Sequence, residues 1–271
     1  MVGDLPEVTR VNNNREQRLA LFWLSLAGFY KRGSCWLLLA GLCVIAAVMP
    51  LLTPWDEQPQ ILQPARAQAA WGYVWLALFT WLPFQAAALG RRLRVNGFLE
   101  FMKARGRRDG ALYLQMGMAV SVWLLGLLAL ACVICVLFCS PKDPREADAW
   151  RALLAQYAAL VLASGAPLCL LGVALGTRSG EVVAYLVPVC LLFCGLIGAS
   201  WLGPLLIGCE LPAYRIVWVL LPHYHLADLT SRLVFKMGAL TPSAFRNVLV
   251  YFLLQGASLT LLGRCALRIR S

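Results

Sequence analysis

The side chains of this chain that could bind a metal are few. His223 and His225 are its only histidines, and they lie close to Asp228. As metal ligands the two histidines would need two more donors, and Asp228 is the one obvious candidate. This pattern favours polar residues at an interface, beside aromatic side chains, over a metal site.

Cysteine is the second residue type that could do chemistry, and there are ten in the chain. Cys132, Cys135 and Cys139 are spaced to share one helical face, but no further ligand for zinc or an iron–sulfur cluster lies nearby in sequence. Most of the ten lie within apolar segments, where cysteine packs as a small apolar residue. We therefore expect no metal and no cofactor in this chain.

Catalytic motifs are also missing from the sequence. It contains no GxxxxGK[ST], HExxH or GxSxG pattern. Ser164 followed by Gly165 would allow an intramembrane serine protease, but small residues at helix contacts explain this pair more simply. We expect that the chain is not an enzyme.

The elements that must position these residues are strongly apolar. Hydrophobic residues make up 61% of the 271 residues, charged residues make up 14%, and the mean hydropathy is +0.71. Soluble domains have about 45–50% apolar and about 25% charged residues, so a bilayer must solvate this surface. The net charge of +11 clusters at the ends of apolar segments, which indicates contact with lipid headgroups and no binding of nucleic acid.

Apolar stretches of about 20 residues are long enough to cross a membrane. Six are predicted, so the fold class is all-α, a polytopic membrane protein with six transmembrane helices. The predicted domains are a cytoplasmic N-terminus with an interfacial helix (1–34), the six-helix domain (35–263) and a cytoplasmic tail (264–271). The six spans run over 35–52, 70–89, 112–139, 152–175, 182–208 and 244–263.

The positive charges predict how these spans are oriented. With the N-terminus inside, sixteen Lys or Arg face the cytoplasm and eight face outward. Because cytoplasmic loops carry the excess of Lys and Arg, both termini are expected in the cytoplasm, with the chain in the inner membrane. Residues 1–18 are polar and do not form a cleavable signal peptide.

The segment before the first span, REQRLALFWLSLAGFYKR, predicts a helix lying in the membrane interface. Leu21 and Leu24 make its opposite face apolar too, which leaves a re-entrant hairpin or an elbow as alternatives. The interfacial residues, which begin with a basic side chain and continue along one face, are Arg18, Phe22, Trp23, Leu26 and Tyr30.

The connection between spans two and three, residues 90–110, reads GRRLRVNGFLEFMKARGRRDG. Its seven basic residues surround one apolar patch, Phe98, Leu99, Phe101 and Met102, with Glu100 inside it. One interpretation is a short amphipathic helix on the lipid surface. The other is a docking helix whose apolar side chains enter a groove of a cytoplasmic partner.

The longest connection, residues 209–243, is apolar in part. Its segment 216–221, IVWVLL, is too short to cross and is expected to enter the outer leaflet only partway.

In its order and spacing of elements the chain resembles the ABC-2 type permeases, the membrane subunits of ATP-binding-cassette transporters. The resemblance rests on the segment REQRLALFWLSLAGFYKR, the six spans, RLRVNGFLEFMKARGRRDGALYLQMGMAV between spans two and three, and LPHYHLADLTSRLVF before the last span. The helix before the first span is more apolar than is usual in that family.

This resemblance implies a half-transporter that pairs with a second permease subunit, as a homodimer or a heterodimer. The connection around Phe98–Met102 would be the coupling helix that docks a separate ATPase subunit, with Glu100 at the position of the family's acidic residue. ATP and magnesium would bind to that ATPase. Residues 216–232 would correspond to partly inserted outer helices.

The span interiors hold few polar groups, and none of them is charged. Proton- or ion-coupled carriers need ionisable groups inside their spans. The absence of such groups favours transport that is powered by another protein. It also favours a hydrophobic or amphipathic substrate, which we expect to be exported from the cell. A membrane scaffold or assembly factor with no transport function is the alternative. The polar residues that could line a pathway are Gln85, Gln115, Ser164 and Gln255.

Overall fold

The structure, a computed structural model, describes residues 19–52, 59–198, 201, 216, 218 and 221–269, and this part of the chain contains helices and no strand. The all-helical prediction is therefore confirmed for the described residues. The elements are α2 (Ala20–Tyr30), α3 (Gly33–Leu52), α4 (Pro59–Phe79), α5 (Trp81–Val95), α6 (Phe98–Ala104), α7 (Asp109–Phe138), α8 (Pro144–Arg178), α9 (Glu181–Phe193), the π-helical turn η1 (Cys194–Gly198), the 3-10 turn η2 (Tyr224–Ala227), α12 (Thr230–Val234) and α13 (Pro242–Ala266).

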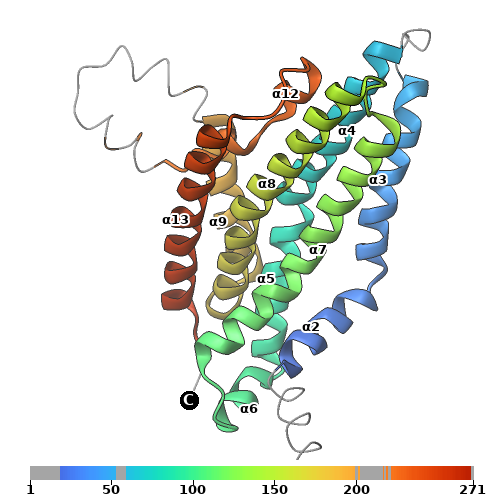
Figure 1. The fold of residues 1–271 in the computed structure, drawn as a ribbon. Coiled ribbons are helices and arrows are strands. Elements are labelled where there is room, and N and C mark those ends of the chain that lie inside the picture. Colours follow the sequence, from blue (N-terminus) through green and yellow to red (C-terminus); the bar gives the residue numbers. More distant parts are fainter. Residues whose placement is uncertain are drawn as a thin grey trace, which may run out of the picture.

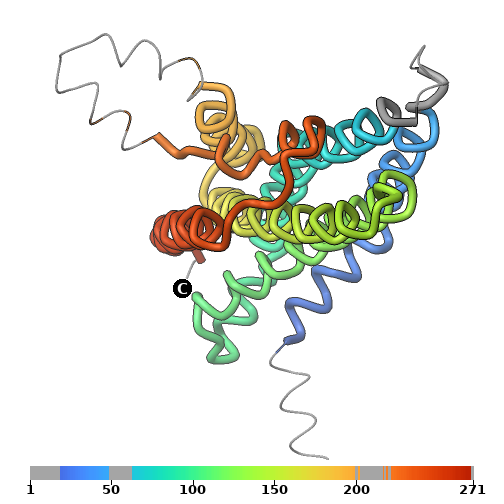
Figure 2. The backbone as a smooth tube through the Cα atoms, turned by 45° about the horizontal axis from the view of Figure 1, so that its top comes forward, coloured from blue at the N-terminus to red at the C-terminus, as the bar shows by residue number. Residues whose placement is uncertain are grey.

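The long helices form a bundle with two distinct ends (Figure 1). At one end lie α6, the turn between α8 and α9, and the last described residues of the chain; we call this the basic end. The other end carries α12, η2 and the start of α8, and we call it the opposite end. Figure 2 shows that α13 lies at one edge of the bundle and α2 and α3 at another.

Five helical segments are long and apolar enough to cross a membrane, and there are six if the bent pair α2–α3 counts as one span. The predicted second span, 70–89, lies within a longer segment, Gln63–Val95, and the predicted third span lies within Asp109–Phe138 apart from its last residue. The predicted fifth span begins as α9 and η1, and most of its remainder lies outside the described residues.

Helices α5 and α8 pack against each other through small residues. A Cβ atom at Gly90 would overlap the carbonyl oxygen of Val173, and one at Gly176 would overlap the carbonyl oxygen of Ala87. Small side chains spaced four apart let two helix backbones approach closely in a membrane, where packing replaces the hydrophobic effect between helices. This contact holds α5 and α8 together.

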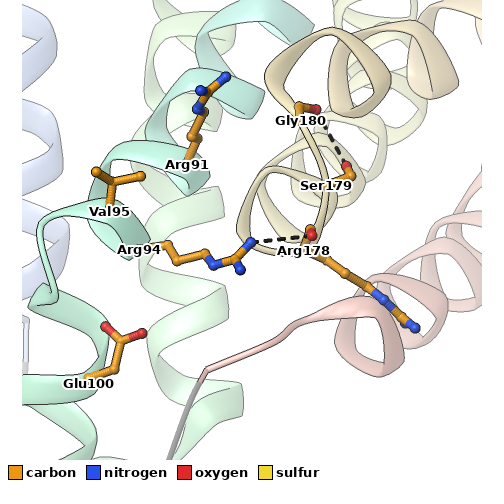
Figure 3. Close-up of a pocket in the computed structure, with 7 residues that line it drawn as sticks. All are labelled: Arg91, Arg94, Val95, Glu100, Arg178, Ser179 and Gly180. Atoms are coloured by element: carbon orange, nitrogen blue, oxygen red, sulfur yellow. Dashed lines mark hydrogen bonds between the residues drawn. The ribbon is translucent and has the colours of Figure 1, made fainter.

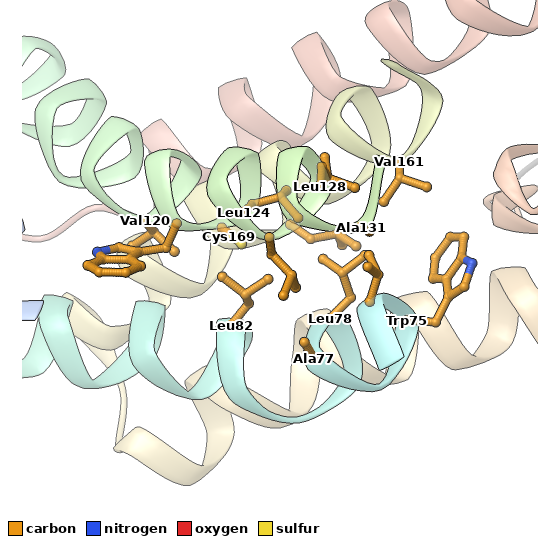
Figure 4. Close-up of a cluster of buried hydrophobic side chains, with 14 of the residues drawn as sticks. Trp75, Ala77, Leu78, Leu82, Val120, Leu124, Leu128, Ala131, Val161 and Cys169 are labelled. Carbon is orange, nitrogen blue, oxygen red and sulfur yellow. The ribbon is translucent and has the colours of Figure 1, made fainter. Parts of the chain in front are cut away.

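The core lies between α4–α5, α7 and α8 (Figure 4). Leu78 and Leu82 meet Leu124 and Leu128 there, and each of these four leucines is at most 1% exposed. The core is therefore built from the helices in the middle of the chain. By contrast, 11% of the apolar stretch of α13 is buried, against 61% for the α4–α5 segment.

A helix break at Thr80 separates α4 from α5. Pro83 has no backbone N–H to donate to the carbonyl of Phe79, four residues earlier. The hydroxyl of Tyr185 on α9 donates to that oxygen instead, at 3.2 Å. The proline thus opens the helix and ties it to α9.

The helix before the first span forms as predicted, but it buries a different face. Leu21, Ser25 and Phe29 are buried, and α2 packs on α7, whereas Trp23 and Tyr30 are exposed. Phe22 and Leu26, from the predicted interfacial face, pack partly against the core, and the placement of that face in the membrane interface stays a prediction. Because both faces are apolar, periodicity could not select between them. Arg18, the first residue of that prediction, lies outside the described residues.

An elbow joins α2 to α3, with a bend of 63°. The side chain of Gln115 on α7 accepts from the backbone N–H of Phe22 in the first turn of α2, at 3.4 Å. Arg32, inside the elbow, donates to the side-chain oxygen of Gln85 at 3.5 Å. Helix starts leave backbone N–H groups without partners, so Gln115 satisfies one of them. The bend is compatible with both the elbow and the re-entrant alternative.

Candidate functional site at the basic end

Two glycines set the position of α6 between the long helices α5 and α7. Gly97 has φ +64° and Gly106 has φ +79°, a left-handed backbone that glycine adopts without strain. Asp109 begins α7, where a negative charge is favourable near the positive end of the helix dipole. The chain can therefore leave α5, form two turns of α6 and enter α7 within a short distance.

Helix α6 has one buried face and one exposed face. Leu99 and Met102, three residues apart, are 0% and 7% exposed and belong to the core cluster. Phe98 is half-buried, and Phe101 is 47% exposed. The docking interpretation of the sequence placed all four apolar residues in a partner's groove, whereas Leu99 and Met102 are buried against the bundle. These two residues anchor α6 to the bundle, because their burial removes apolar surface from water.

Phe101 is the exposed apolar residue of α6. Its ring lies 6.1 Å from that of Phe98, and the guanidinium of Arg105 lies 4.3 Å from its centre. A cation over an aromatic face is attracted by the ring's electrons. The outer face of α6 is thus an aromatic surface with a basic rim.

Lys103 fastens α6 to both neighbouring segments. Its Nζ lies 3.3 Å from the carboxylate of Asp109 and donates to the carbonyl of Ile269 at 3.3 Å. One residue earlier, the backbone N–H of Arg268 donates to Oγ1 of the fully buried Thr177 at 3.2 Å. The last described residues are thereby held against α6 and α8.

A groove of about 500 Å³ separates α5 and α6 from the turn between α8 and α9. Figure 3 shows Arg94 crossing this groove to donate to the carbonyl of Arg178, at 3.2 Å, while the Arg178 side chain points away. Arg91 pairs with Glu181 at 3.7 Å. The carboxylate of Glu100 points into the same groove, and its Oε2 atom is buried without a hydrogen-bond partner.

This arrangement could bind a partner. A buried carboxylate oxygen without a donor is unfavourable, so Glu100 would gain from a donor that a bound partner brings. No group of three His, Cys, Asp or Glu side chains able to hold a metal ion occurs among the described residues. The basic end therefore offers a fixed helix, an exposed aromatic ring and one unpaired acceptor.

The opposite end has a different kind of polar site, centred on Tyr157 of α8. The indole of Trp75 donates to the Tyr157 hydroxyl at 2.8 Å, and that hydroxyl donates to the carboxylate of Asp228 at 2.6 Å. Thr230 Oγ1 lies 2.7 Å from the same hydroxyl, and the ring of Trp71 stacks on that of Tyr157 with centres 3.8 Å apart. Each lone pair and proton of the hydroxyl therefore has a partner.

Gln156, next to Tyr157, binds a later part of the segment between η2 and α13. Its side-chain amide donates to the carbonyl of Leu240 at 3.0 Å and accepts from the N–H of Leu240 at 2.8 Å. Gln156 and Tyr157 thus attach the segment between η2 and α13 to α8 at two points.

Sequence reasoning missed both residues. The signal that could have found them is a pair of polar side chains, Gln156 and Tyr157, placed together inside an otherwise apolar span.

The histidines lie among aromatic rings, in agreement with the interpretation of the sequence. The ring of His223 is 4.8 Å from that of Trp218 and 6.0 Å from that of Tyr251, and its backbone N–H donates to the Tyr251 hydroxyl at 2.9 Å. Asp228 is turned toward Tyr157. Burial first, and the neighbouring His225 second, lower the pKa of His223.

The four polar residues predicted to line a pathway do not form one cluster. Gln85 contacts the α2–α3 elbow at Arg32, Gln115 contacts the first turn of α2 at Phe22, and Ser164 donates to the carbonyl of Val161 in its own helix at 3.1 Å. The side-chain oxygen of Gln255 on α13 is buried without a partner. No hydrogen bond joins any two of these four in the part of the chain that the structure describes. Their part in a pathway stays a prediction.

Comparison with protein-family models, with curated proteins and with solved structures gives no match for this chain. The resemblance to ABC-2 type permeases therefore rests on the sequence features described above.

Proposed function

We propose that this chain is the membrane subunit of an ATP-binding-cassette transporter, and that α6 couples it to a separate ATPase subunit. The observation that carries the proposal is the construction of α6. Leu99 and Met102 fix it to the bundle, while Phe101 and the unpaired Oε2 atom of Glu100 remain available to a partner. A rigidly held helix with an exposed aromatic residue can transmit a push or pull to the long helices.

The charge distribution supports a cytoplasmic position for α6. The basic connection, the turn at Arg178 and the C-terminal residues all lie at one end of the bundle, as the contacts of Lys103 and Arg94 show. Positively charged connections remain on the cytoplasmic side of the inner membrane, so the proposed orientation places this end inside. An ATPase that binds cytoplasmic ATP and magnesium would meet it there.

The free surface supports assembly with a second permease subunit. Helix α13 is the span with the smallest buried share, 11% of its apolar stretch, and lies at the edge of the bundle (Figure 2). In the proposed transporter a second subunit, identical or related, would pack in this region. Movement of the two subunits would then open a path for export of a hydrophobic or amphipathic substrate.

The test is to co-express the chain with an ATP-binding-cassette ATPase of the same organism and to measure their association after purification in detergent. Phe101→Asp places a charge on the exposed face of α6 and is expected to weaken the association at least about tenfold. Phe235→Asp is the matched control, because Phe235 is 74% exposed and lies at the opposite end, beside α12.

Two outcomes would overturn the proposal. One is an ATPase that binds the Phe101→Asp variant as tightly as it binds the wild-type chain. The other is a fluorescent protein, fused after the last residue and active only in the cytoplasm, that stays dark, since this would place the basic end outside.

A further inference from the structure

A cavity of about 330 Å³ lies between α3, α4 and α7, away from the site described above. Its apolar walls come from Ala46 and Ala47 on α3 and from Ile134 and Phe138 on α7, with Cys43 beside them. The one charged residue that lines it is Arg66 on α4. The volume lies at the lower end of the range of about 300–1,000 Å³ that is usual for small-ligand sites.

The packing of α3 explains why space remains here. At Gly41 the two helices are in close contact, because an added Cβ would overlap the hydroxyl of Tyr73 on α4. One to two turns further along α3, the alanines at 46 and 47 are too short to fill the gap. Cys43, Ala47 and Phe138 are exposed, so the cavity opens onto the surface that faces lipid.

The guanidinium of Arg66 has a donor atom without a hydrogen-bond acceptor. Its Nε atom is buried without a hydrogen-bond partner, and the described residues include no ion pair to its guanidinium. The ring of Phe138 lies 5.8 Å from the guanidinium carbon, and the buried Cys139 interacts electrostatically with the same group. A partly buried cationic donor without an acceptor is unfavourable, and a phosphate matches the guanidinium fork with two parallel hydrogen bonds.

The depth of Arg66 in the membrane matches that of a lipid headgroup. The helical segment Gln63–Val95 has 33 residues and would be about 50 Å long, compared with about 30 Å for the hydrocarbon core. Arg66 lies in the second turn of α4, near the start of this segment and at the opposite end of the bundle from α6. In a bilayer that covers the middle of this segment, the guanidinium would lie at the level of the lipid phosphates, with the alanine-lined cavity on the hydrocarbon side.

We propose that this cavity is a binding site for an anionic phospholipid of the membrane. The phosphate binds to Arg66, and part of one acyl chain lies against Ala46, Ala47, Ile134 and Phe138. The assignment rests on charge complementarity and on the opening toward lipid. It does not depend on an ATPase, so it stands or falls separately from the proposed function.

The experiment measures lipid binding to the full-length chain, purified in detergent and stripped of lipid, by native mass spectrometry. Phosphatidylglycerol, phosphatidylcholine and oleate are titrated in parallel. Phosphatidylglycerol is expected to bind more tightly than phosphatidylcholine, and Arg66→Ala is expected to lower its affinity for the tightest site about tenfold. Arg246→Ala is the matched control, since Arg246 is exposed at the same end of the bundle and does not line the cavity.

A second variant keeps the charge and removes the space. Ala47→Phe, on the exposed side of the cavity, is expected to lower the affinity for phosphatidylglycerol to a similar degree without unfolding the chain. A photo-crosslinking residue at position 47 should then capture phosphatidylglycerol in the wild-type background and lose most of this product with Arg66→Ala.

Three results would overturn the proposal: unchanged affinity in both Arg66→Ala and Ala47→Phe, equal affinity for phosphatidylcholine, or an Arg66-dependent preference for oleate. The last result would assign the cavity to a free fatty acid.

Discussion

Two polar sites, one at each end of the bundle, differ in how far their polar groups are satisfied. At the opposite end, the Tyr157 hydroxyl has three partners, and Gln156 satisfies both polar groups of the Leu240 backbone. At the basic end, Glu100 keeps an unpaired oxygen, and Phe101 stays exposed. Satisfied buried groups make a structure rigid, whereas unsatisfied ones remain available to a ligand or partner. Of these two sites, the one formed by Glu100 and Phe101 is therefore the better candidate for regulated contact.

Within the basic end, the two faces of α6 should respond very differently to the same change. Leu99→Asp would bury a carboxylate at a position that is 0% exposed, and we expect a loss of roughly 4 kcal/mol or more in stability. The measurement is the apparent melting temperature and the monodisperse fraction in detergent.

Phe101→Asp is the matched comparison for that substitution, with an expected change within about 0.5 kcal/mol because its side chain is on the surface. Equal destabilisation by the two variants would contradict the assignment of an anchored face and a free face.

The Tyr157 site provides the next largest effect. Tyr157→Phe keeps the ring stacked on Trp71 but leaves the Trp75 indole and the Asp228 carboxylate without that partner, which should cost about 2–4 kcal/mol. Thermal unfolding in detergent measures the loss. Tyr30→Phe, at a residue that is 60% exposed, should leave stability unchanged. A Tyr157→Phe protein as stable as the wild type would mean that this end is not held by the hydroxyl.

The attachment of the C-terminal residues can be tested with a smaller change. Thr177→Val removes the acceptor of the Arg268 N–H and should cost about 1 kcal/mol, which would free the segment after α13. Trypsin cleavage after Arg268 should accelerate in this variant. The control is Thr260→Val, since the Thr260 hydroxyl donates to the carbonyl of Gly256 in its own helix. Identical cleavage rates in all three proteins would argue against this attachment.

The smallest expected effect is a pH dependence at the opposite end. The pKa of His223 is lowered in the folded chain, so the unfolded chain takes up a proton first as the pH falls below about 6.5. Acidification from pH 7.5 toward the lowered pKa should therefore destabilise the fold around His223, with no effect above pH 7.5. His223→Gln should show a fall in melting temperature smaller by about 1 °C over this interval. A steeper fall in the variant would reverse the sign of this argument.

The sequence predicted the helices well because the requirement for lipid burial is local. Each span had to present about 20 apolar residues, and the seven basic residues of segment 90–110 marked a connection between two of them. The faces were harder to predict. In α2, Leu21 and Phe22 are adjacent and both apolar, so only the packing on α7 selected the buried one. For the same reason, the docking interpretation assigned Leu99 to a surface that binds a partner, whereas the structure buries Leu99 against the bundle.

The polar contacts that cross the bundle were beyond sequence reasoning. Tyr157 and Asp228 are separated by 71 residues, and Arg32 and Gln85 by 53. No short-range pattern links such pairs, since their approach depends on how several helices pack. Arg66 is a further example. In the sequence it is only a positive charge in the connection between the first two spans. Only the packing of α3 and α7 shows that an apolar cavity lies beside it.

By itself, the amino-acid sequence determined that this chain is helical, rich in segments able to span a membrane, and charged asymmetrically along its length. These properties follow from composition and from the order of residues along each helix. Only the tertiary structure decided which apolar residues are anchors, which polar groups are satisfied and where a charged side chain meets an apolar cavity. The reason is physical: burial and hydrogen bonding at a helix surface depend on the neighbouring helix, and distant parts of the chain supply that neighbour.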